Sequence, residues 1–298
     1  MIRKIPLTAA ILWIFSFAGN ALAADYERSE FIVSTAELST LLDKDTVKIV
    51  DARKLDKYQV GHIPGAISLP RKKTQFKWRG TSGFMVPLKA MEKIFSDRGI
   101  KPTDTLIFYD DQMKPTVTRL FWTPHVLGHQ KARVLNGGMA LWVKEARPVS
   151  KEIPSVITSD YKAKPDWSVL ADSAYVFSKL NKPEITLIDT RSPKEWSGLK
   201  ASRKVKRAGR IPGAKLVDWS WHVTKKDGVT TLKTAAELKR MFARTGATKE
   251  KEIISYCRTG MRSSHSYWVL KLLGYPNVRN FDGSMIEWGN RMELPLEN

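Results

Sequence analysis

The stretch Glu252–Leu273, EIISYCRTGMRSSHSYWVLKLL, contains the only cysteine among the 298 residues of the chain. A short apolar run at positions 253–256 has the length of a strand and leads directly into Cys257. Large apolar residues then recur at three-residue steps from Tyr267 to Leu273, a spacing typical of the buried face of a helix. The pattern predicts a strand, a short loop that carries the cysteine, and the start of a helix.

This loop predicts a reactive thiolate. A helix N-terminus offers unsatisfied N–H groups and the positive end of a dipole, so a cysteine just before it can have a pKa well below the free value of about 8.5. Arg258 and Arg262 add positive charge, and we expect Ser263 and Ser264 to cap the helix. A buried structural cysteine is the alternative, but two arginines and Gly260 do not form the apolar surroundings of such a residue.

The first 23 residues predict a secretory signal peptide. Arg3 and Lys4 form a basic start, positions 7–18 are almost wholly apolar, and Ala21-Leu22-Ala23 has the small-x-small pattern of a cleavage site. The apolar run is too short for a comfortable membrane span, although a retained anchor stays open. We therefore expect an exported protein of the bacterial periplasm, with no stable membrane insertion after signal cleavage.

The composition predicts two ordinary globular domains and an anionic partner. The chain is 42% hydrophobic and 27% charged, and its length exceeds that of the usual single domain. One cysteine cannot form an internal disulfide in an exported chain. A net charge of +20 attracts small anions, while the scattered basic residues argue against nucleic acid. With one cysteine and five scattered histidines, we expect no metal and no other cofactor.

The chain contains an internal repeat. In the first half Ile49–Arg53 (IVDAR) precedes Gly61–Ala66 (GHIPGA), and in the second half Leu187–Arg191 (LIDTR) precedes Gly209–Ala214 (GRIPGA). Three further pairs of segments match in the same order, namely 106–110 with 253–257, 127–129 with 273–275, and 137–142 with 283–288. The two halves therefore share one structural plan.

Each half alternates short strands with helices. The strands are expected at 47–50 and 105–109 and at 186–188 and 252–256, and the helices at 36–42, 88–95, 173–180 and 235–242. Such alternation predicts an α/β fold in which each half has a central parallel β-sheet flanked by helices. The proline-containing segment 147–167 predicts a linker. We place the first domain at 24–150, the linker at 151–167 and the second domain at 168–298.

As a set, these motifs resemble the rhodanese family of sulfurtransferases in its tandem two-domain form. The set comprises Asp-x-Arg, Gly-His-Ile-Pro-Gly-Ala, a strand that ends in a cysteine loop, Leu-Gly-Tyr and a closing Gly-x-x-x-x-Trp, and it covers nearly the whole mature chain. The resemblance implies two tandem rhodanese-like domains, with catalysis in the second. In the first domain Asp110 occupies the position of Cys257, so we expect that domain to be catalytically silent.

The resemblance also implies a mechanism. The Cys257 thiolate would take the outer sulfur of a small anionic donor as a persulfide, and a nucleophilic acceptor such as cyanide or a thiol, or an acceptor protein, would remove it. The two loop guanidiniums would bind the sulfonate end of thiosulfate. The substrate-binding residues expected on this basis are Arg258, Thr259, Gly260, Met261, Arg262 and Trp219.

Loop length and composition favour the thiosulfate type. Cysteine phosphatases and arsenate reductases place five residues between cysteine and arginine, whereas four separate Cys257 from Arg262 here. Mercaptopyruvate-type members carry an uncharged Cys-Gly-Ser-Gly loop. Many tandem members have a substrate-contacting arginine where this chain has Glu195, so we do not transfer that role. A persulfide carrier or binding module that serves a partner protein, and a mercaptopyruvate-type sulfurtransferase, remain the alternatives.

The Asp-x-Arg motif that occurs in both halves has a structural interpretation. Asp189 and Arg191 stand at the end of their strand, and Asp51 and Arg53 stand at the matching place in the silent half. Because the pair occurs in both halves, we expect a structural salt bridge in each half rather than substrate binding.

The remaining candidates are aromatic. Trp219 follows the second Ile-Pro-Gly-Ala segment and is a candidate to line the pocket, as an aromatic residue does in some similar thiosulfate enzymes; packing in the core is the alternative. His265 lies about two helical turns beyond the cysteine, so we expect packing or surface exposure rather than general-base catalysis. His62 is expected to shape a turn.

Overall fold

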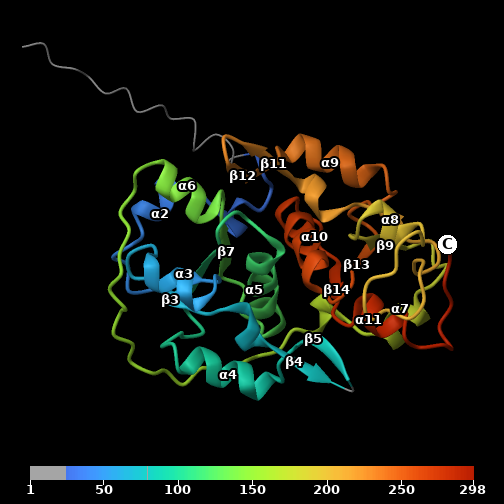
Figure 1. The fold of residues 1–298 in the computed structure, drawn as a ribbon, viewed down its shortest axis with the longest axis horizontal. Helices are drawn as coiled ribbons and strands as arrows, with labels where there is room; N and C mark the ends of the chain where they lie inside the picture. Colours follow the sequence, from blue (N-terminus) through green and yellow to red (C-terminus); the bar gives the residue numbers. More distant parts are fainter. Residues whose placement is uncertain (1–24, 79) are drawn as a thin grey trace, which may run out of the picture.

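The computed structural model describes residues 25–78 and 80–298, which fold into two lobes that lie side by side (Figure 1). Residues 1–23, where we predicted a signal peptide, lie outside the described residues. Within the described part of the chain, no helix is both long and apolar enough to cross a membrane.

Each lobe has a sheet of five parallel strands, and the two sheets have the same strand order. The first sheet contains, from edge to edge, β1 (Ile32–Val33), β7 (Ala132–Leu135), β6 (Thr105–Tyr109), β2 (Val47–Asp51) and β3 (Ile67–Ser68). The second contains β8 (Leu170–Ala171), β14 (Val278–Phe281), β13 (Glu252–Tyr256), β9 (Ile185–Asp189) and β10 (Lys215–Leu216). The predicted α/β fold with two parallel sheets is therefore confirmed.

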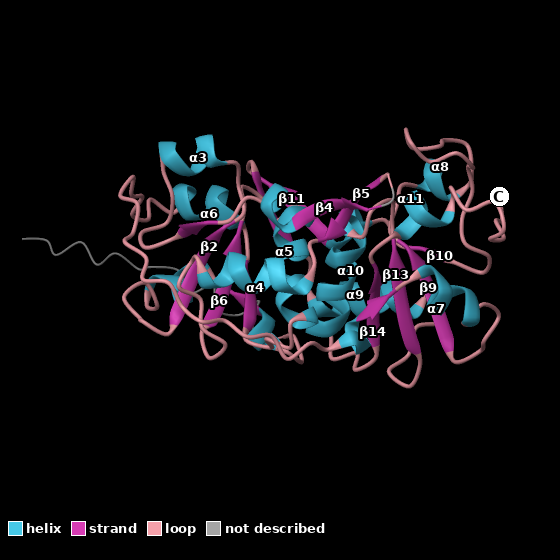
Figure 2. Ribbon diagram, turned by 90° about the horizontal axis from the view of Figure 1, so that it is seen from below, coloured by secondary structure: helices cyan, strands magenta, loops and turns pink. Residues whose placement is uncertain are grey.

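Helices flank both sheets (Figure 2). In each lobe a short hairpin follows the third strand in chain order, β3 or β10. The helices of the first lobe are α2 (Thr35–Ser39), α3 (Leu55–Val60), α4 (Leu88–Ser96), α5 (Pro115–Val126) and α6 (Gly138–Lys144). Those of the second are α7 (Ser173–Ser178), α8 (Pro193–Trp196), α9 (Ala235–Ala243), α10 (Met261–Leu272) and α11 (Ser284–Trp288). The hairpins, which we did not predict, are β4 (Gln75–Trp78) with β5 (Thr81–Met85) and β11 (Val223–Lys226) with β12 (Val229–Leu232).

A buried ion pair fixes the end of strand β9. The Asp189 carboxylate accepts from the Arg191 backbone N–H (3.0 Å), from its Nε (2.9 Å) and from its Nη2 (2.6 Å), and the same Nη2 donates to the Gly209 carbonyl (2.8 Å). The Tyr256 hydroxyl bonds to Asp189 and accepts from the Ile211 N–H at 3.1 Å. The Asp-x-Arg and Gly-x-Ile-Pro-Gly-Ala motifs are therefore two parts of one network.

The same network recurs in the first lobe. Asp51 binds Arg53 through Nη2 at 2.6 Å, and Arg53 Nη2 also donates to the Gly61 carbonyl at 2.6 Å. Tyr109 donates to Asp51 (2.6 Å) and accepts from the Ile63 N–H (3.1 Å). Both structural salt bridges that we expected are confirmed.

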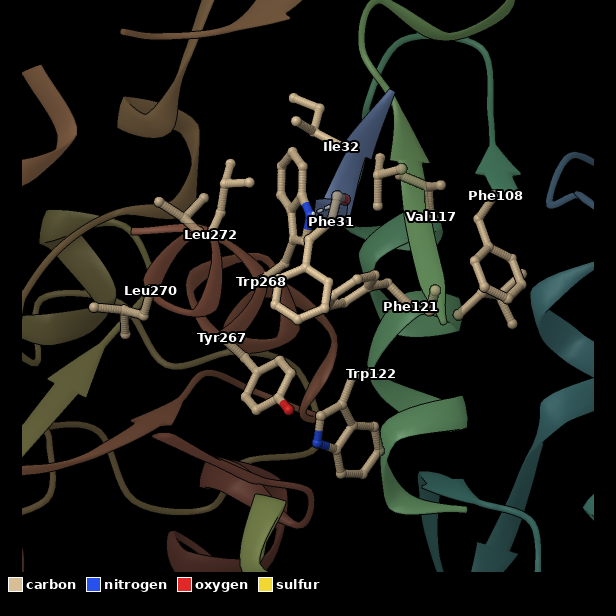
Figure 3. Close-up of a cluster of buried hydrophobic side chains, with 14 of the residues drawn as sticks. Phe31, Ile32, Phe108, Val117, Phe121, Trp122, Tyr267, Trp268, Leu270 and Leu272 are labelled. Carbon is tan, nitrogen blue, oxygen red and sulfur yellow. Dashed lines mark hydrogen bonds between the residues drawn. The ribbon is translucent and has the colours of Figure 1, made fainter. Parts of the chain in front are cut away.

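The two lobes share a hydrophobic core. Helix α5 packs against α10, and their aromatic side chains interdigitate with Phe31 (Figure 3). The rings of Phe121 and Trp268 lie 6.4 Å apart, Trp268 Nε1 donates to the Phe31 carbonyl, and Trp122 Nε1 donates to the Val169 carbonyl, each at 3.0 Å. Because the buried cluster is continuous between the lobes, they are held as one packed unit.

Residues 151–166, inside the predicted linker, contain no helix or strand. Tyr161 is nevertheless buried, and its ring packs edge-on against Phe95 with a centroid distance of 5.0 Å. This part of the linker therefore lies along the first lobe.

The ion-pair network predicts a stability effect. Replacing one partner leaves the other charge buried and unpaired, which costs about 3–5 kcal/mol. We expect Asp51→Asn to lower the free energy of unfolding by this amount in urea denaturation. Asp56→Asn is the matched control, because Asp56 is exposed on the following helix, and it should change stability by less than about 0.5 kcal/mol. Equal effects of the two substitutions would contradict a structural role for the pair.

Candidate active site

The cysteine loop connects strand β13 to helix α10. Cys257 directly follows the strand, and α10 begins at Met261 after Gly260, whose φ of 68° lies in the left-handed region that glycine tolerates. Our expectation that Ser263 and Ser264 cap the helix is wrong, because the chain turns earlier and both serines lie in the first helical turn.

The sulfur atom lies against N–H and hydroxyl donors. The Thr259 N–H donates to Sγ at 3.4 Å, and the Ser263 hydroxyl lies 3.6 Å from Sγ. Burial alone would raise the pKa of the Cys257 thiol, but the charge of Arg262 and these donors outweigh it and lower the pKa. The site therefore favours a thiolate although only 1% of the cysteine is exposed.

Ser284 stabilises the cysteine loop through hydrogen bonds to its backbone. Its Oγ accepts from the N–H groups of Cys257 (3.1 Å) and Gly260 (2.9 Å) and donates to the Phe281 carbonyl (2.7 Å). Its φ of 49° is unusual for a residue with a side chain. We did not predict this residue, yet the repeat contains a signal, because the matching position in the first half is Gly138, with φ 57°.

Arg262 is paired with Glu195. Nη1 and Nη2 donate to the two carboxylate oxygens at 2.8 and 3.0 Å. Burial alone would raise the pKa of Glu195, but the hydrogen bonds and charge of Arg262 outweigh it and lower the pKa to about 2. Arg262 is thus shared between this carboxylate and the sulfur, while Arg258 is exposed and donates to Ser202 Oγ at 3.1 Å. The two guanidiniums that we expected to act alike therefore have different surroundings.

A cavity of about 470 Å³ opens beside the cysteine. Its lining residues are Glu195, Lys200, Ala201, Ser202, Arg203, Cys257, Arg258, Thr259, Met261 and Arg262. Four of them, 200–203, come from the segment between Arg191 and Gly209, which is ten residues longer than its counterpart in the first half. Sequence reasoning missed this wall, and the longer segment was the available signal.

Trp219 does not line this cavity. Its ring instead lies against His265, with a centroid distance of 5.7 Å. His265 is fully buried, its Nδ1 lies 3.1 Å from Nδ1 of His222, and burial lowers its pKa to about 3. The packing role of His265 is confirmed, whereas a contact of Trp219 with substrate stays a prediction.

His62 has a structural position. Its Nδ1 bonds to the Tyr58 carbonyl at 2.8 Å, its ring stacks on Tyr58, and its backbone pairs with Ser150. These contacts hold the turn that we expected His62 to shape.

The first lobe fills its matching loop with a carboxylate. Asp110 follows β6 and accepts from the N–H groups of Gln112 (3.0 Å) and Lys114 (3.0 Å). Burial raises the pKa of Asp110 to about 7, although these donors favour the charged form. The loop has N–H donors like those of the cysteine loop but no sulfur atom.

Among the described residues, no group of three or more His, Cys, Asp or Glu side chains is placed to hold a metal ion. The chemistry that the site offers is that of a thiolate beside cationic groups.

Two substitutions should shift the thiol pKa in opposite directions. Glu195→Gln leaves the Arg262 charge unshared near Sγ, so the thiol pKa should fall and iodoacetamide alkylation should persist to lower pH. Arg262→Gln removes the cation and should shift the alkylation profile to higher pH. Glu37→Gln is the control, because Glu37 pairs with Arg133 at 2.7 Å in the other lobe. Shifts of the same sign in both site variants would refute this electrostatic account.

Comparison with known proteins agrees with this geometry. The model of the rhodanese-like domain matches residues 34–145 and 173–291. A thiosulfate sulfurtransferase of Azotobacter vinelandii is 30% identical over 92% of this chain and 99% of its own length. The sulfur carrier protein TtuD of Thermus thermophilus is 35% identical over 91% of this chain and 98% of its own length.

A solved structure shares the fold. The anaerobic ergothioneine biosynthesis enzyme from Chlorobium limicola superposes with a TM-score of 0.80 at 23% identity, covering 91% of this chain and 71% of that chain. At this identity the likeness concerns the fold alone. With both lobes matched by the family model and with full-length relatives at 30% identity or more, the chain belongs to the rhodanese family, in its tandem two-domain form.

Proposed function

We propose that this protein is an exported sulfurtransferase that moves a sulfane sulfur from thiosulfate, or a similar anionic donor, to cyanide or a thiol through a persulfide on Cys257. The observation that carries the proposal is the arrangement at the sulfur, where Arg262 and the loop N–H donors lower the thiol pKa beside an open cationic cavity. The names of the full-length relatives support the donor class.

The reaction needs no redox partner. The Cys257 thiolate attacks the outer sulfur of thiosulfate, the S–S bond breaks, and sulfite leaves with the bonding electron pair. The persulfide carries the negative charge, which the Thr259 N–H and the Ser263 hydroxyl can stabilise. Cyanide then attacks the outer sulfur, thiocyanate leaves, and the thiolate is restored.

Cationic side chains at the cavity wall would bind the donor. Arg262 is already paired with Glu195, so the sulfonate group of thiosulfate would bind to Arg258, Lys200 and Arg203 instead. Arg258 offers a forked donor that suits an oxyanion, and its exposure leaves it accessible.

Export is part of the proposal. It depends on residues 1–23, with their basic start, apolar run and Ala-Leu-Ala site. Expression of the full chain in a bacterium should give a periplasmic protein whose N-terminus begins near Ala24. Recovery of the uncleaved chain in the cytoplasmic fraction would contradict export.

A persulfide carrier is the second candidate. One full-length relative is a sulfur carrier protein, and the same Cys257 persulfide would serve that role. The two candidates differ in the acceptor, since a carrier passes its sulfur to one partner protein and turns over poorly with cyanide. A mercaptopyruvate-type activity fits less well, because the loop beside the cysteine is cationic.

Purified protein should convert thiosulfate and cyanide to thiocyanate, and Cys257→Ser should abolish turnover. Donor treatment without acceptor should add one sulfur atom to the intact mass of the wild type and none to Cys257→Ser. Persulfide formation without thiocyanate production would favour the carrier, and absence of the added sulfur would overturn both candidates.

The thiocyanate assay also tests which residues bind the donor. Arg258→Gln should raise the KM for thiosulfate about tenfold, because it removes one charge-assisted hydrogen bond to the donor. The kcat should change little. Lys226→Gln removes an exposed charge on β11, which does not line the cavity, and serves as the control. An unchanged KM in Arg258→Gln would exclude Arg258 from donor binding.

A further inference from the structure

The silent lobe places one buried arginine at the base of the catalytic loop. Arg119 extends from α5 of the first lobe and is 0% exposed. Its Nη2 lies 2.5 Å from Asp282 Oδ1 in the second lobe, and its Nη1 donates to the Gly260 carbonyl at 3.2 Å. A buried guanidinium needs such partners, so this ion pair ties the lobes together at the loop that carries the cysteine.

Gly260 is held at both of its polar groups. Its N–H donates to Ser284 Oγ, and its carbonyl accepts from Arg119 and from Asn280 Nδ2 (3.0 Å). A Cβ at position 260 would lie 2.7 Å from Asp282 Oδ1 and 2.8 Å from Arg119 Nη1. The turn therefore contacts the ion pair directly, and a displacement of the guanidinium would shift the Gly260 backbone.

The first lobe also contacts the loop from its hairpin. Arg119 Nη2 donates to the Gly83 carbonyl of β5 at 3.2 Å, and a Cβ at Gly83 would lie 3.0 Å from Thr259 Cβ. Asp282 Oδ2 accepts from the Met85 N–H at 3.0 Å. The arginine thus links the hairpin, the loop and Asp282 into one contact region.

The matching residue of the second lobe is neutral. Helix α5 (Pro115–Val126) matches α10 (Met261–Leu272) residue for residue, so the position in α10 that corresponds to Arg119 is His265. His265 is fully buried, and burial lowers its pKa to about 3, so its imidazole carries no charge at neutral pH. Of these two matched positions, only the one that faces the cysteine loop carries a charged side chain.

We propose that Arg119 is a positioning residue for the catalytic loop of the other lobe. By holding the Gly260 carbonyl, it keeps the turn in the conformation that directs the Thr259 N–H at Sγ. The silent lobe thereby completes the environment that stabilises the thiolate. This inference rests on the proposed role of Cys257 as the sulfur-carrying thiolate.

The test variant is Arg119→Met/Asp282→Asn in the full mature chain. It removes both charges together, so neither is left buried without a partner, and it removes the donor to the Gly260 carbonyl. The pH dependence of iodoacetamide alkylation should shift to higher pH, with a rate at neutral pH lower by about threefold or more. Alkylation involves no sulfur donor, so its outcome is independent of the thiocyanate assay that tests the proposed function.

Gln112→Ala is the matched control. Gln112 of the first lobe also bonds to the second lobe, but to the hairpin β11–β12 rather than to the cysteine loop. Its Nε2 donates to the Gly228 carbonyl (2.9 Å), and its Oε1 accepts from Thr230 (3.1 Å). A weakened interface alone would change both variants equally, whereas a positioning role predicts a normal alkylation profile for Gln112→Ala. Equal shifts, or an unchanged profile in the folded double variant, would overturn the proposal.

Arg119→Lys covers the case in which the double variant does not fold. Lysine keeps the charge opposite Asp282 but lacks the fork that reaches two carbonyls. It should shift the alkylation profile in the same direction by a smaller amount, and a wild-type profile in this variant would equally overturn the proposal.

Discussion

The contact between the Asp189 carboxylate and the Arg191 guanidinium determines where Cys257 lies. The same carboxylate binds the hydroxyl of Tyr256, the residue immediately before Cys257, and Arg191 also reaches the carbonyl of Gly209. A buried charge is costly unless each of its partners is in place, so these groups have one low-energy arrangement. The carboxyl end of β13 is thereby fixed to β9 and to the start of the Ile-Pro-Gly-Ala segment.

The two lobes show what this scaffold does with different residues at the loop. In the first lobe the Asp110 carboxylate occupies the loop N–H donors permanently, because it belongs to the chain. In the second, Ser284 takes two of the N–H groups, and the Thr259 N–H is left for the sulfur. A polarizable thiolate can take up and release a sulfur atom there, whereas a carboxylate cannot. The loop N–H groups thus bind a carboxylate that belongs to the chain in one lobe and face a thiol sulfur in the other.

Charge around the cysteine is divided between two arginines with separate partners. Glu195 holds Arg262 beside Sγ, where the cation favours the thiolate but is less free to bind an external anion. Arg258 stands at the exposed wall with the basic segment that contains Lys200. The carboxylate therefore holds one arginine beside the thiol and leaves the other accessible at the cavity, a difference that the sequence of the loop alone does not reveal.

The sequence by itself determined the repeat, the two parallel sheets, and the matching positions of Cys257 and Asp110 at the ends of their strands. These follow from local patterns, since apolar periodicity, turn residues and a strand-loop-helix order act within a few residues. The tertiary structure alone decided that Glu195 pairs with Arg262, that Ser284 holds the loop and that Trp219 lies away from the cavity. Arg119 likewise lies 141 residues from the carbonyl it contacts. Such pairings depend on how two lobes pack through a shared core, and distances between remote side chains are set by that packing rather than by sequence spacing.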